Sequence, residues 1–396
     1  IESDVRDALV ALNPILAEDS SRVDLVLSRL RAVLVTVADE GLIKSNERMI
    51  NWLRGLESID LPGVEHVPPI RLIDFENPRA NKCIVSREVT FQVGTEKPRR
   101  FDIVLWVNGF PLVVGETKSP VEQGQKTSWL NAAKDIADTY EVEVPRFFVP
   151  NVLNFATEGK DFRIGAVGAP PEIWQPWSST NEEILQPSLK KTMRSAELLL
   201  TPESVLDMMR TFTLYTSIRV GAGTKQIKII ARYPQVEAVK AITDRAADPG
   251  KKKGLIVHTQ GSGKTFISAF ACGRIRRDVP GATVLVVLDR IDLIEQTTRE
   301  FKSAGIDRLS VAETKEELQQ ILAAGKRGVI LTTVFRFKDA GFLSDRDDIV
   351  ILVDEAHRTQ EGSLGMDMRG ALPNATYIGM TGTAISEKDR DTFENF

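Results

Sequence analysis

The 396-residue sequence has little of what export, membrane insertion or metal binding by cysteine requires. It contains two cysteines, Cys83 and Cys272, which lie far apart and fit no metal-binding spacing. No apolar run approaches the roughly 20 residues that a transmembrane helix needs. The chain starts with polar residues and lacks the basic and then apolar order of a signal peptide. These absences favour a reduced, cytoplasmic protein without a membrane segment.

An excess of positive charge is also missing. Lys and Arg number 51 against 55 Asp and Glu, which gives a net charge of −4 and argues against a uniformly basic nucleic-acid binder without excluding one. Local basic clusters remain at 251–253 and 274–277, and solvated charge beside a helix explains them as well as nucleic-acid binding does. Hydrophobic residues make up 42% of the chain, so each of the two domains expected at this length can bury a core.

The first part of the chain mixes helical and strand patterns. The expected elements are helices at 19–39 and 46–56, a strand-rich stretch at 82–118, a helix at 125–140 and a strand at 146–149. From about 169 to 188 the chain becomes rich in Pro, Trp and Ser, which marks the edge of a first domain. Thr201, as N-cap, and Pro202 then begin a helix that is expected to bridge the domains.

From Gly254 onward, short apolar runs alternate with helical patterns. The runs are 255–257, 284–288, 329–331, 349–353 and 376–379. Unbroken apolar strands between helices indicate a parallel sheet covered on both faces. The sequence therefore predicts an α/β protein, with a first α/β domain at 1–180, a linker and bridging helix at 181–225, and a parallel-sheet domain at 226–396.

A glycine-rich segment lies between the strand at 255–257 and a predicted helix: Gly261-Ser262-Gly263-Lys264-Thr265. In this context glycines let backbone N–H groups surround phosphates, and the helix N-terminus adds its positive end. Lys264 is expected to reach the β- and γ-phosphates of ATP, and Thr265 to bind Mg²⁺. His258 stands where the strict motif has glycine. The segment predicts an ATP and Mg²⁺ site.

An acidic pair follows the apolar strand at 349–353. Ligands of open α/β sheets bind beyond the carboxyl ends of the strands, so Asp354 is expected to meet the Mg²⁺ held by Thr265. Glu355 is placed to accept a proton from the attacking water. A surface acidic pair at a strand end is the alternative, and the phosphate loop upstream argues against it.

Asp354-Glu355-Ala356-His357 and further motifs resemble those of superfamily 2 helicases of the DEAH type. Gln235 lies where that family's adenine-reading glutamine sits, and 289–293, 332–333 and 381–384 resemble its DNA-contacting and ATP-coupling motifs. The resemblance implies the first RecA-like lobe of an ATP-driven motor. The chain ends at Phe396, before a second lobe with its arginine finger. We therefore expect the fragment to bind ATP but to hydrolyse it slowly or not at all.

A second set of charged residues flanks the turn signal Asn108-Gly109. Glu116 and Lys118 are two apart on a strand, so both side chains emerge on one face. If Asp102 joins them, two carboxylates hold Mg²⁺ while Lys118 polarises water or the scissile phosphate, as in the PD-(D/E)xK arrangement. An ordinary amphipathic hairpin with solvent-facing charges explains the same residues.

Strand register decides between these interpretations. A two-residue turn pairs Val107 with Phe110, and hence Asp102 with Gly115, which leaves Glu116 on the opposite face. The site assembles only if the register shifts by one residue, through a three-residue loop or a bulge at Gly115.

Several neighbouring residues have no fixed role. Glu47 is a further carboxylate that could join the site. Family nucleases often carry Gln-x-x-x-Tyr on the following helix, and here Ile136 stands four residues before Tyr140. No role follows from the sequence for Gln123, Gln125, Trp129 or Tyr140.

Two stretches together resemble one family, the R subunits of type I restriction enzymes. They are 108–112 running into Glu116-Thr117-Lys118, and 231–235 followed by 258–265. The resemblance implies a subunit that joins methyltransferase (M) and specificity (S) subunits, translocates double-stranded DNA with ATP and cleaves it at a distance with Mg²⁺. Nothing in it implies a membrane. The nuclease precedes the motor, whereas type III restriction subunits have the opposite order.

Two alternatives remain open. The chain could be the amino-terminal part of a single-chain restriction–modification enzyme. It could also be a DEAH-type translocase or plain helicase whose amino-terminal domain is a non-catalytic docking platform.

Overall fold

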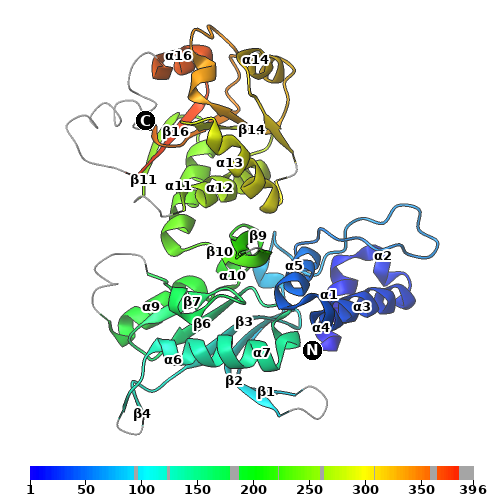
Figure 1. Ribbon diagram of the computed structural model, residues 1–396. Coiled ribbons are helices and arrows are strands. Elements are labelled where there is room, and N and C mark those ends of the chain that lie inside the picture. Colours follow the sequence, from blue (N-terminus) through cyan, green and yellow to red (C-terminus); the bar gives the residue numbers. More distant parts are fainter. Residues whose placement is uncertain are drawn as a thin grey trace. The chain divides into compact units, whose positions relative to one another are not determined.

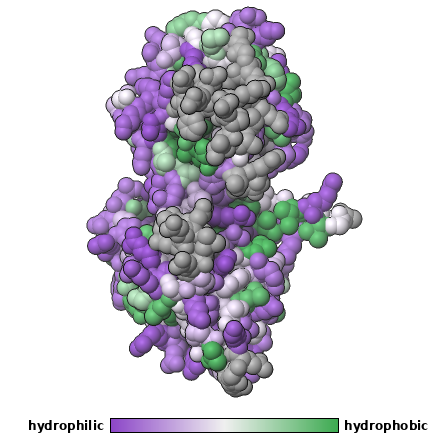
Figure 2. Space-filling model, turned by 90° about the vertical axis from the view of Figure 1, so that its left-hand side faces the viewer, coloured by the Kyte–Doolittle hydropathy of each residue, from purple (hydrophilic) through white to green (hydrophobic). Residues whose placement is uncertain are grey.

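The structure, a computed structural model, describes residues 1–92, 97–122, 125–178, 187–221, 223–258, 263–306, 308–356 and 364–382. It divides into two compact units, Ile1–Tyr233 and Pro234–Phe396 (Figure 1). Among the described residues, no helix is long and apolar enough to cross a membrane. On the face shown in Figure 2, hydrophilic residues predominate and apolar residues gather in small groups.

The first unit begins with a group of helices. They are α1 (Glu2–Leu12), α2 (Pro14–Ala17), α3 (Ser20–Val35), α4 (Val37–Glu40) and α5 (Leu42–Leu53), followed by the 3₁₀ turn η1 (Pro78–Ala80). The helix predicted at 19–39 is present as α3 and α4, which are separated by Thr36. The helix predicted at 46–56 is α5, which begins after Gly41, a residue with φ of 81°. Both helix predictions are confirmed, with shifted ends.

A six-stranded sheet follows, with the strand order β1-β2-β3-β6-β7-β8. Its strands are β1 (Cys83–Phe91), β2 (Arg99–Val107), β3 (Phe110–Thr117), β6 (Leu153–Thr157), β7 (Phe162–Gly165) and β8 (Gln175–Pro176). Neighbours are antiparallel except β3 and β6, which are parallel. The strand-rich stretch predicted at 82–118 is therefore confirmed.

One helical segment covers a face of this sheet (Figure 1). It runs from α6 (Trp129–Lys134) through a π-helix, η2 (Asp135–Tyr140), to α7 (Glu141–Glu143). Its start is later than predicted, because the hairpin of β4 (Val121–Glu122) and β5 (Gln125–Lys126) precedes it. The strand predicted at 146–149 is wrong. Pro145–Phe148 forms the 3₁₀ helix η3, since Pro145 favours a first helical turn, and the strand comes later as β6.

The first unit ends with two helices and a hairpin after the 3₁₀ turn η4 (Pro171–Ile173). These elements are α9 (Leu189–Leu199), α10 (Pro202–Arg210), β9 (Thr213–Val220) and β10 (Gly223–Ile230). Thr201 caps α10 by accepting a hydrogen bond from Ser204 N, as predicted. The unit boundary lies at Tyr233 and Pro234, not at a linker over 181–225. The reason is that the hairpin buries Tyr215 and Lys228 against the rest of the first unit.

The second unit is built on a six-stranded parallel sheet, with the order β11-β16-β15-β12-β14-β13. Its strands are β11 (Lys253–Val257), β12 (Thr283–Leu288), β13 (Leu309–Val311), β14 (Gly328–Thr333), β15 (Ile349–Val353) and β16 (Thr376–Thr381). Its helices are α11 (Tyr233–Ala247), α12 (Lys264–Asp278), α13 (Asp292–Ser303), α14 (Lys315–Ala323), η5 (Val334–Phe337) and α16 (Leu364–Ala371). All five predicted apolar runs are strands, and the α/β prediction for this part is confirmed.

Candidate functional site

The β2–β3 hairpin has a two-residue turn and a shifted register. Asn108 and Gly109 have φ of 48° and 83°, which is the two-residue turn that favours Asn-Gly. Val107 pairs with Phe110, but farther along Ile103 pairs with Gly115. One extra residue therefore lies in β3, beside Pro111, which has no N–H for the ladder.

The extra residue is stabilised from the next strand region. The carbonyl of Leu112 accepts a hydrogen bond of 2.7 Å from Val152 N, just before β6. One step beyond the last pair, Ile103 and Gly115, this register would set Asp102 opposite Glu116, and both side chains do line one pocket. The register condition set by the sequence is thus met, although neither by a three-residue loop nor by a bulge at Gly115.

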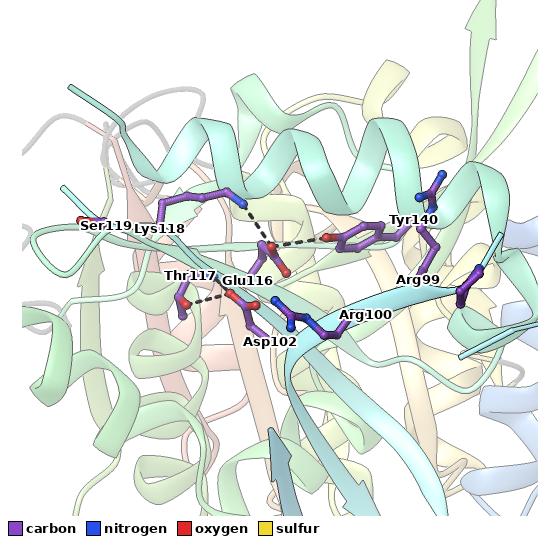
Figure 3. A pocket seen from close by; sticks show the side chains of 9 residues that line it. Arg99, Arg100, Asp102, Glu116, Thr117, Lys118, Ser119 and Tyr140 are labelled. Carbon is purple, nitrogen blue, oxygen red and sulfur yellow. Dashed lines mark hydrogen bonds and ion pairs between the residues drawn. The ribbon is translucent and has the colours of Figure 1, made fainter. Parts of the chain in front are cut away.

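Asp102, Glu116 and Lys118 line one pocket of about 450 Å³, together with Arg99, Arg100 and Tyr140 (Figure 3). Asp102 Oδ2 accepts hydrogen bonds from Thr117 N at 2.9 Å and from Thr117 Oγ1 at 2.8 Å. These two bonds fix the orientation of the Asp102 carboxylate. Thr117 was not singled out from the sequence, although it stands between the two residues that were.

Glu116 is almost fully buried, and its two oxygens differ. Oε1 accepts from Lys118 Nζ at 3.2 Å and from the Tyr140 hydroxyl at 3.4 Å. Oε2 is buried and has no hydrogen-bond partner among the described residues. A buried, unpaired carboxylate oxygen is costly unless a cation or donor meets it. This oxygen therefore favours a ligand in the pocket.

The charges of the pocket shift one another's titration. Burial, with the charge of Asp102 in support, raises the pKa of Glu116 to about 7. Burial opposes the charged form of Lys118, but the hydrogen bonds and charges of Asp135 and Glu116 outweigh it and raise the pKa of Lys118. Lys118 therefore stays protonated at neutral pH. It can donate hydrogen bonds and stabilise negative charge, and it cannot act as a base.

The π-helix brings a further acid to Lys118. Asp135 Oδ2 lies 2.5 Å from Lys118 Nζ, while Tyr140 bonds to Glu116. In a π-helix hydrogen bonds join residues i and i+5, so the residue five before Tyr140 faces the same side as it does. Ile136, four before Tyr140, is buried in the core instead. Sequence reasoning missed Asp135 because an α-helix would have turned it away.

Other residues considered from the sequence lie elsewhere. Glu47 accepts a hydrogen bond of 2.5 Å from Gln226 of β10 and does not line the pocket, so it is no ligand there. Trp129 contacts Arg163 instead, whose guanidinium carbon lies 4.9 Å from the centroid of the tryptophan ring. Gln123 lies outside the described residues, and Gln125 belongs to β5.

The donor set of the pocket suits a magnesium ion with few protein ligands. Among the described residues, no group of three or more His, Cys, Asp or Glu side chains is arranged to hold a metal. Mg²⁺ is commonly bound by one or two carboxylates, with water and phosphate oxygens completing its shell. Asp102 and the unpaired oxygen of Glu116 fit that requirement.

The second unit brings the phosphate loop and the acidic pair together. Lys264, in the first turn of α12, donates a hydrogen bond of 2.8 Å to Glu355 Oε1. Burial, followed by the charge of Glu355, raises the pKa of Asp354 above its ordinary value. Thr265 lies beside Lys264 at the start of the same helix. Gly261 and Ser262 of the loop, like His357 and 383–384, lie outside the described residues.

Gln235 packs against the same loop. A Cβ at Gly263 would lie 2.8 Å from Gln235 Nε2, which is too close. Gly263 also has φ of 81°, a backbone conformation that favours glycine. His258, which replaces the first glycine of the strict motif, has its ring Nε2 3.3 Å from the Pro234 carbonyl. Its backbone N–H also donates to Thr381 O at 2.8 Å. His258, the residue that departs from the motif, thus contacts the start of α11.

Family models match both parts of the chain. Residues 1–173 match the model described as "Type I restriction enzyme R protein N terminus". Residues 234–396 match the model of the SWI2/SNF2 ATPase. The second range coincides with the second compact unit, and the first range lies within the first unit.

Curated relatives cover the chain as well. It is 32% identical, over 99% of its length and 39% of the relative's, to the type I restriction enzyme HindI endonuclease subunit of Haemophilus influenzae. It is 27% identical, over 82% of its length and 33% of the relative's, to the putative MjaIXP endonuclease subunit of Methanocaldococcus jannaschii. The chain therefore spans less than half the length of these relatives.

Two solved structures resemble part of the chain. One is the Sulfolobus solfataricus SWI2/SNF2 ATPase core in complex with dsDNA, at 17% identity and a TM-score of 0.32, over 41% of this chain and 34% of that one. The other is the Pyrococcus furiosus Hef helicase domain, at 22% identity and a TM-score of 0.32. This match covers 40% of this chain and 35% of that one. Likenesses of this size say nothing about function.

Proposed function

We propose that this chain, which belongs to the family of type I restriction enzyme R subunits, carries a Mg²⁺-dependent endonuclease site in its first unit and the first RecA-like lobe of an ATP-driven DNA motor in its second. The whole subunit would work with M and S subunits on double-stranded DNA. ATP-dependent translocation would precede cleavage. Sequence specificity would come from the S subunit, because a motor that follows the phosphate backbone needs no base contacts.

The observation that carries the nuclease proposal is the shifted register of β2 and β3. It is the register that would bring Asp102 and Glu116 to one face, and it is supported by the pocket that both line and by the unpaired oxygen of Glu116. These two residues would hold Mg²⁺, which supplies a water of lowered pKa and steadies charge on the phosphate. Thr117 orients Asp102, and the protonated Lys118 stabilises the negative charge that develops on the phosphate.

Lys118 is shared between two acids, which sets its position. Its ammonium lies 3.2 Å from Glu116 and 2.5 Å from Asp135. When Glu116 is engaged by a metal ion, Asp135 can still hold Lys118 at the pocket. Tyr140, whose pKa is raised by burial and by the charge of Glu116, remains a hydrogen-bond donor to that carboxylate.

In the second unit, the roles follow from position at the carboxyl ends of β11 and β15. Lys264 and the loop residues Gly261, Ser262 and Gly263 would hold the phosphates, and Gln235 the adenine. Thr265 and Asp354 would bind the Mg²⁺ of ATP. Glu355 would accept the proton of the attacking water, with Lys264 as its ion-pair partner within 2.8 Å.

The test uses the full-length subunit assembled with its M and S subunits on unmethylated plasmid DNA. Asp102→Ala and Glu116→Ala should each abolish cleavage and leave DNA-stimulated ATP hydrolysis intact. Glu172→Ala, an exposed acid on η4, is the matched control and should change neither activity. If both pocket variants cleave like the wild type, the first unit is a docking platform and the nuclease proposal is wrong.

A further inference from the structure

Two arginines line the pocket without a role in the proposed metal binding or catalysis. Arg99 and Arg100 begin β2 and line the cavity beside Asp102. Arg99 is 18% exposed and forms an ion pair with Glu143 of α7, which connects the start of β2 to that helix. Arg100 is different: its side chain is 64% exposed and points toward Asp102 and Glu116 in Figure 3.

Arg100 contributes little to the stability of the fold. Among the described residues its ion-pair partner is Glu88 of β1, at 3.6 Å, and that carboxylate is 70% exposed. Exposed pairs of this kind are worth about 0 to 1 kcal/mol because water and salt screen them. A guanidinium held this loosely at the mouth of an acidic pocket is available to another anion.

We propose that Arg100 binds a phosphate group of the DNA strand, next to the phosphate that is cleaved. The inference rests on the proposed nuclease function. Guanidinium presents its N–H donors in a fork that matches two oxygens of one phosphate. Lys118 lies on one side of the two carboxylates and Arg100 on the other (Figure 3), so a strand crossing the pocket meets both cations.

Glu88 then acts as a competitor for the same guanidinium. It has φ of 54° within β1, and its carboxylate is the group that the phosphate displaces. Removing its charge frees Arg100 before DNA arrives. Glu88→Gln should therefore have the opposite effect to the loss of Arg100, which a purely structural pair cannot produce.

The experiment measures single-turnover DNA cleavage by the full-length subunit, assembled with M and S subunits, over a series of salt concentrations. Arg100→Ala should slow cleavage by about 10- to 100-fold, as expected for a charge-assisted hydrogen bond. It should also reduce the slope of log rate against log salt by about one. Arg100→Lys should be intermediate, and Glu88→Gln should cleave at least as fast as the wild type. ATP hydrolysis should not change in any variant.

Arg87→Ala is the matched control, since Arg87 is exposed on the same strand as Glu88 and does not line the pocket. It should behave as the wild type. If Arg100→Ala cleaves normally with an unchanged salt slope while Asp102→Ala is inactive, the inference is wrong and the nuclease proposal stands. If Arg100→Ala instead raises the Mg²⁺ concentration needed for half-maximal cleavage, Arg100 acts on the metal site and the inference is also wrong. Normal cleavage by Asp102→Ala overturns the nuclease proposal itself.

Discussion

Lys264 Nζ lies 2.8 Å from Glu355 Oε1, so the lysine of the phosphate loop and the acid after β15 form an ion pair. Their side chains are 10% and 24% exposed, and water screens the pair only partly. Glu355 also has φ of 47°, a conformation that costs a non-glycine residue roughly 1–2 kcal/mol. Such strain persists where the surroundings fix it, and it concentrates at functional sites.

We predict that Glu355→Gln separates ATP binding from ATP hydrolysis in the full-length subunit. Loss of the base should reduce DNA-stimulated hydrolysis by about 100-fold or more. Binding of a fluorescent ATP analogue should persist, because Lys264 is kept and loses a competing carboxylate. Lys264→Ala should lose both. The control is Glu295→Gln, an exposed acid paired with Arg299 on α13. Hydrolysis by Glu355→Gln at the rate of the control would contradict the assigned role.

The second unit shows why the sequence predicts some elements well. Strands such as Ile349–Val353 are buried throughout, so their apolar runs carry the signal without help from the rest of the fold. β13 (Leu309–Val311) escaped prediction because it is short, half-buried and at the edge of the sheet. The core strands of this unit could therefore be predicted from the sequence because they are buried on both faces.

The first unit shows what the sequence could not give. The extra residue in β3 accepts a hydrogen bond from Val152 N at the Leu112 carbonyl, a contact between residues far apart in the chain. Asp135 reaches Lys118 through a π-helical turn, which no residue pattern in the sequence predicted. The residue types of the pocket were predictable, whereas their assembly depended on tertiary contacts.

Glu116 should make the stability of the first unit depend on pH. Its pKa in the folded protein is about 7, above the ordinary value of 4.5, since burial and Asp102 disfavour its charge. Between these two values the folded state keeps a proton that the unfolded state releases, so stability falls as the pH rises. The full difference is on the order of 3 kcal/mol.

We therefore predict that Glu116→Gln stabilises the first unit at pH 8 and has little effect at pH 4. Glutamine resembles the protonated acid, which the wild type already holds at the lower pH. Urea unfolding in the presence of EDTA, followed by tryptophan fluorescence, is the measurement. In the 396-residue chain all five tryptophans lie within the first unit, so the fluorescence of this chain reports on that unit. Comparison at each pH removes the contribution of Glu141, whose pKa burial raises to about 8. Equal stabilisation at both pH values would contradict the prediction.

Thr117→Val tests how Asp102 is oriented. Valine keeps the shape and the backbone N–H of Thr117 but removes the hydroxyl that donates to Asp102 Oδ2 at 2.8 Å. Loss of such a partner of a metal ligand typically weakens metal affinity or activity by about 10- to 100-fold. The Mg²⁺ concentration for half-maximal cleavage should rise accordingly. Thr117→Ser keeps the hydroxyl and should stay near the wild type, and equal behaviour of the two variants would exclude this role.

Gly115→Ala tests the packing that holds the catalytic strand. A Cβ at Gly115 would overlap the ring of Phe155 on the neighbouring strand β6, and the ring is 3% exposed and stacked on Phe162. Because the ring has little space to move, the substitution should cost about 1–3 kcal/mol or more.

The control for this substitution is Gly223→Ala in the same unit, where the nearest atom to an added Cβ is the Val220 carbonyl oxygen at 3.9 Å. Its effect should stay within about 0.5 kcal/mol. Urea unfolding followed by tryptophan fluorescence measures both. A double variant, Gly115→Ala with Phe155→Leu, should recover part of the loss, because the smaller side chain leaves room for the methyl group. If the second substitution adds its own cost in full, contact with Phe155 is not the reason that glycine is required beside Glu116.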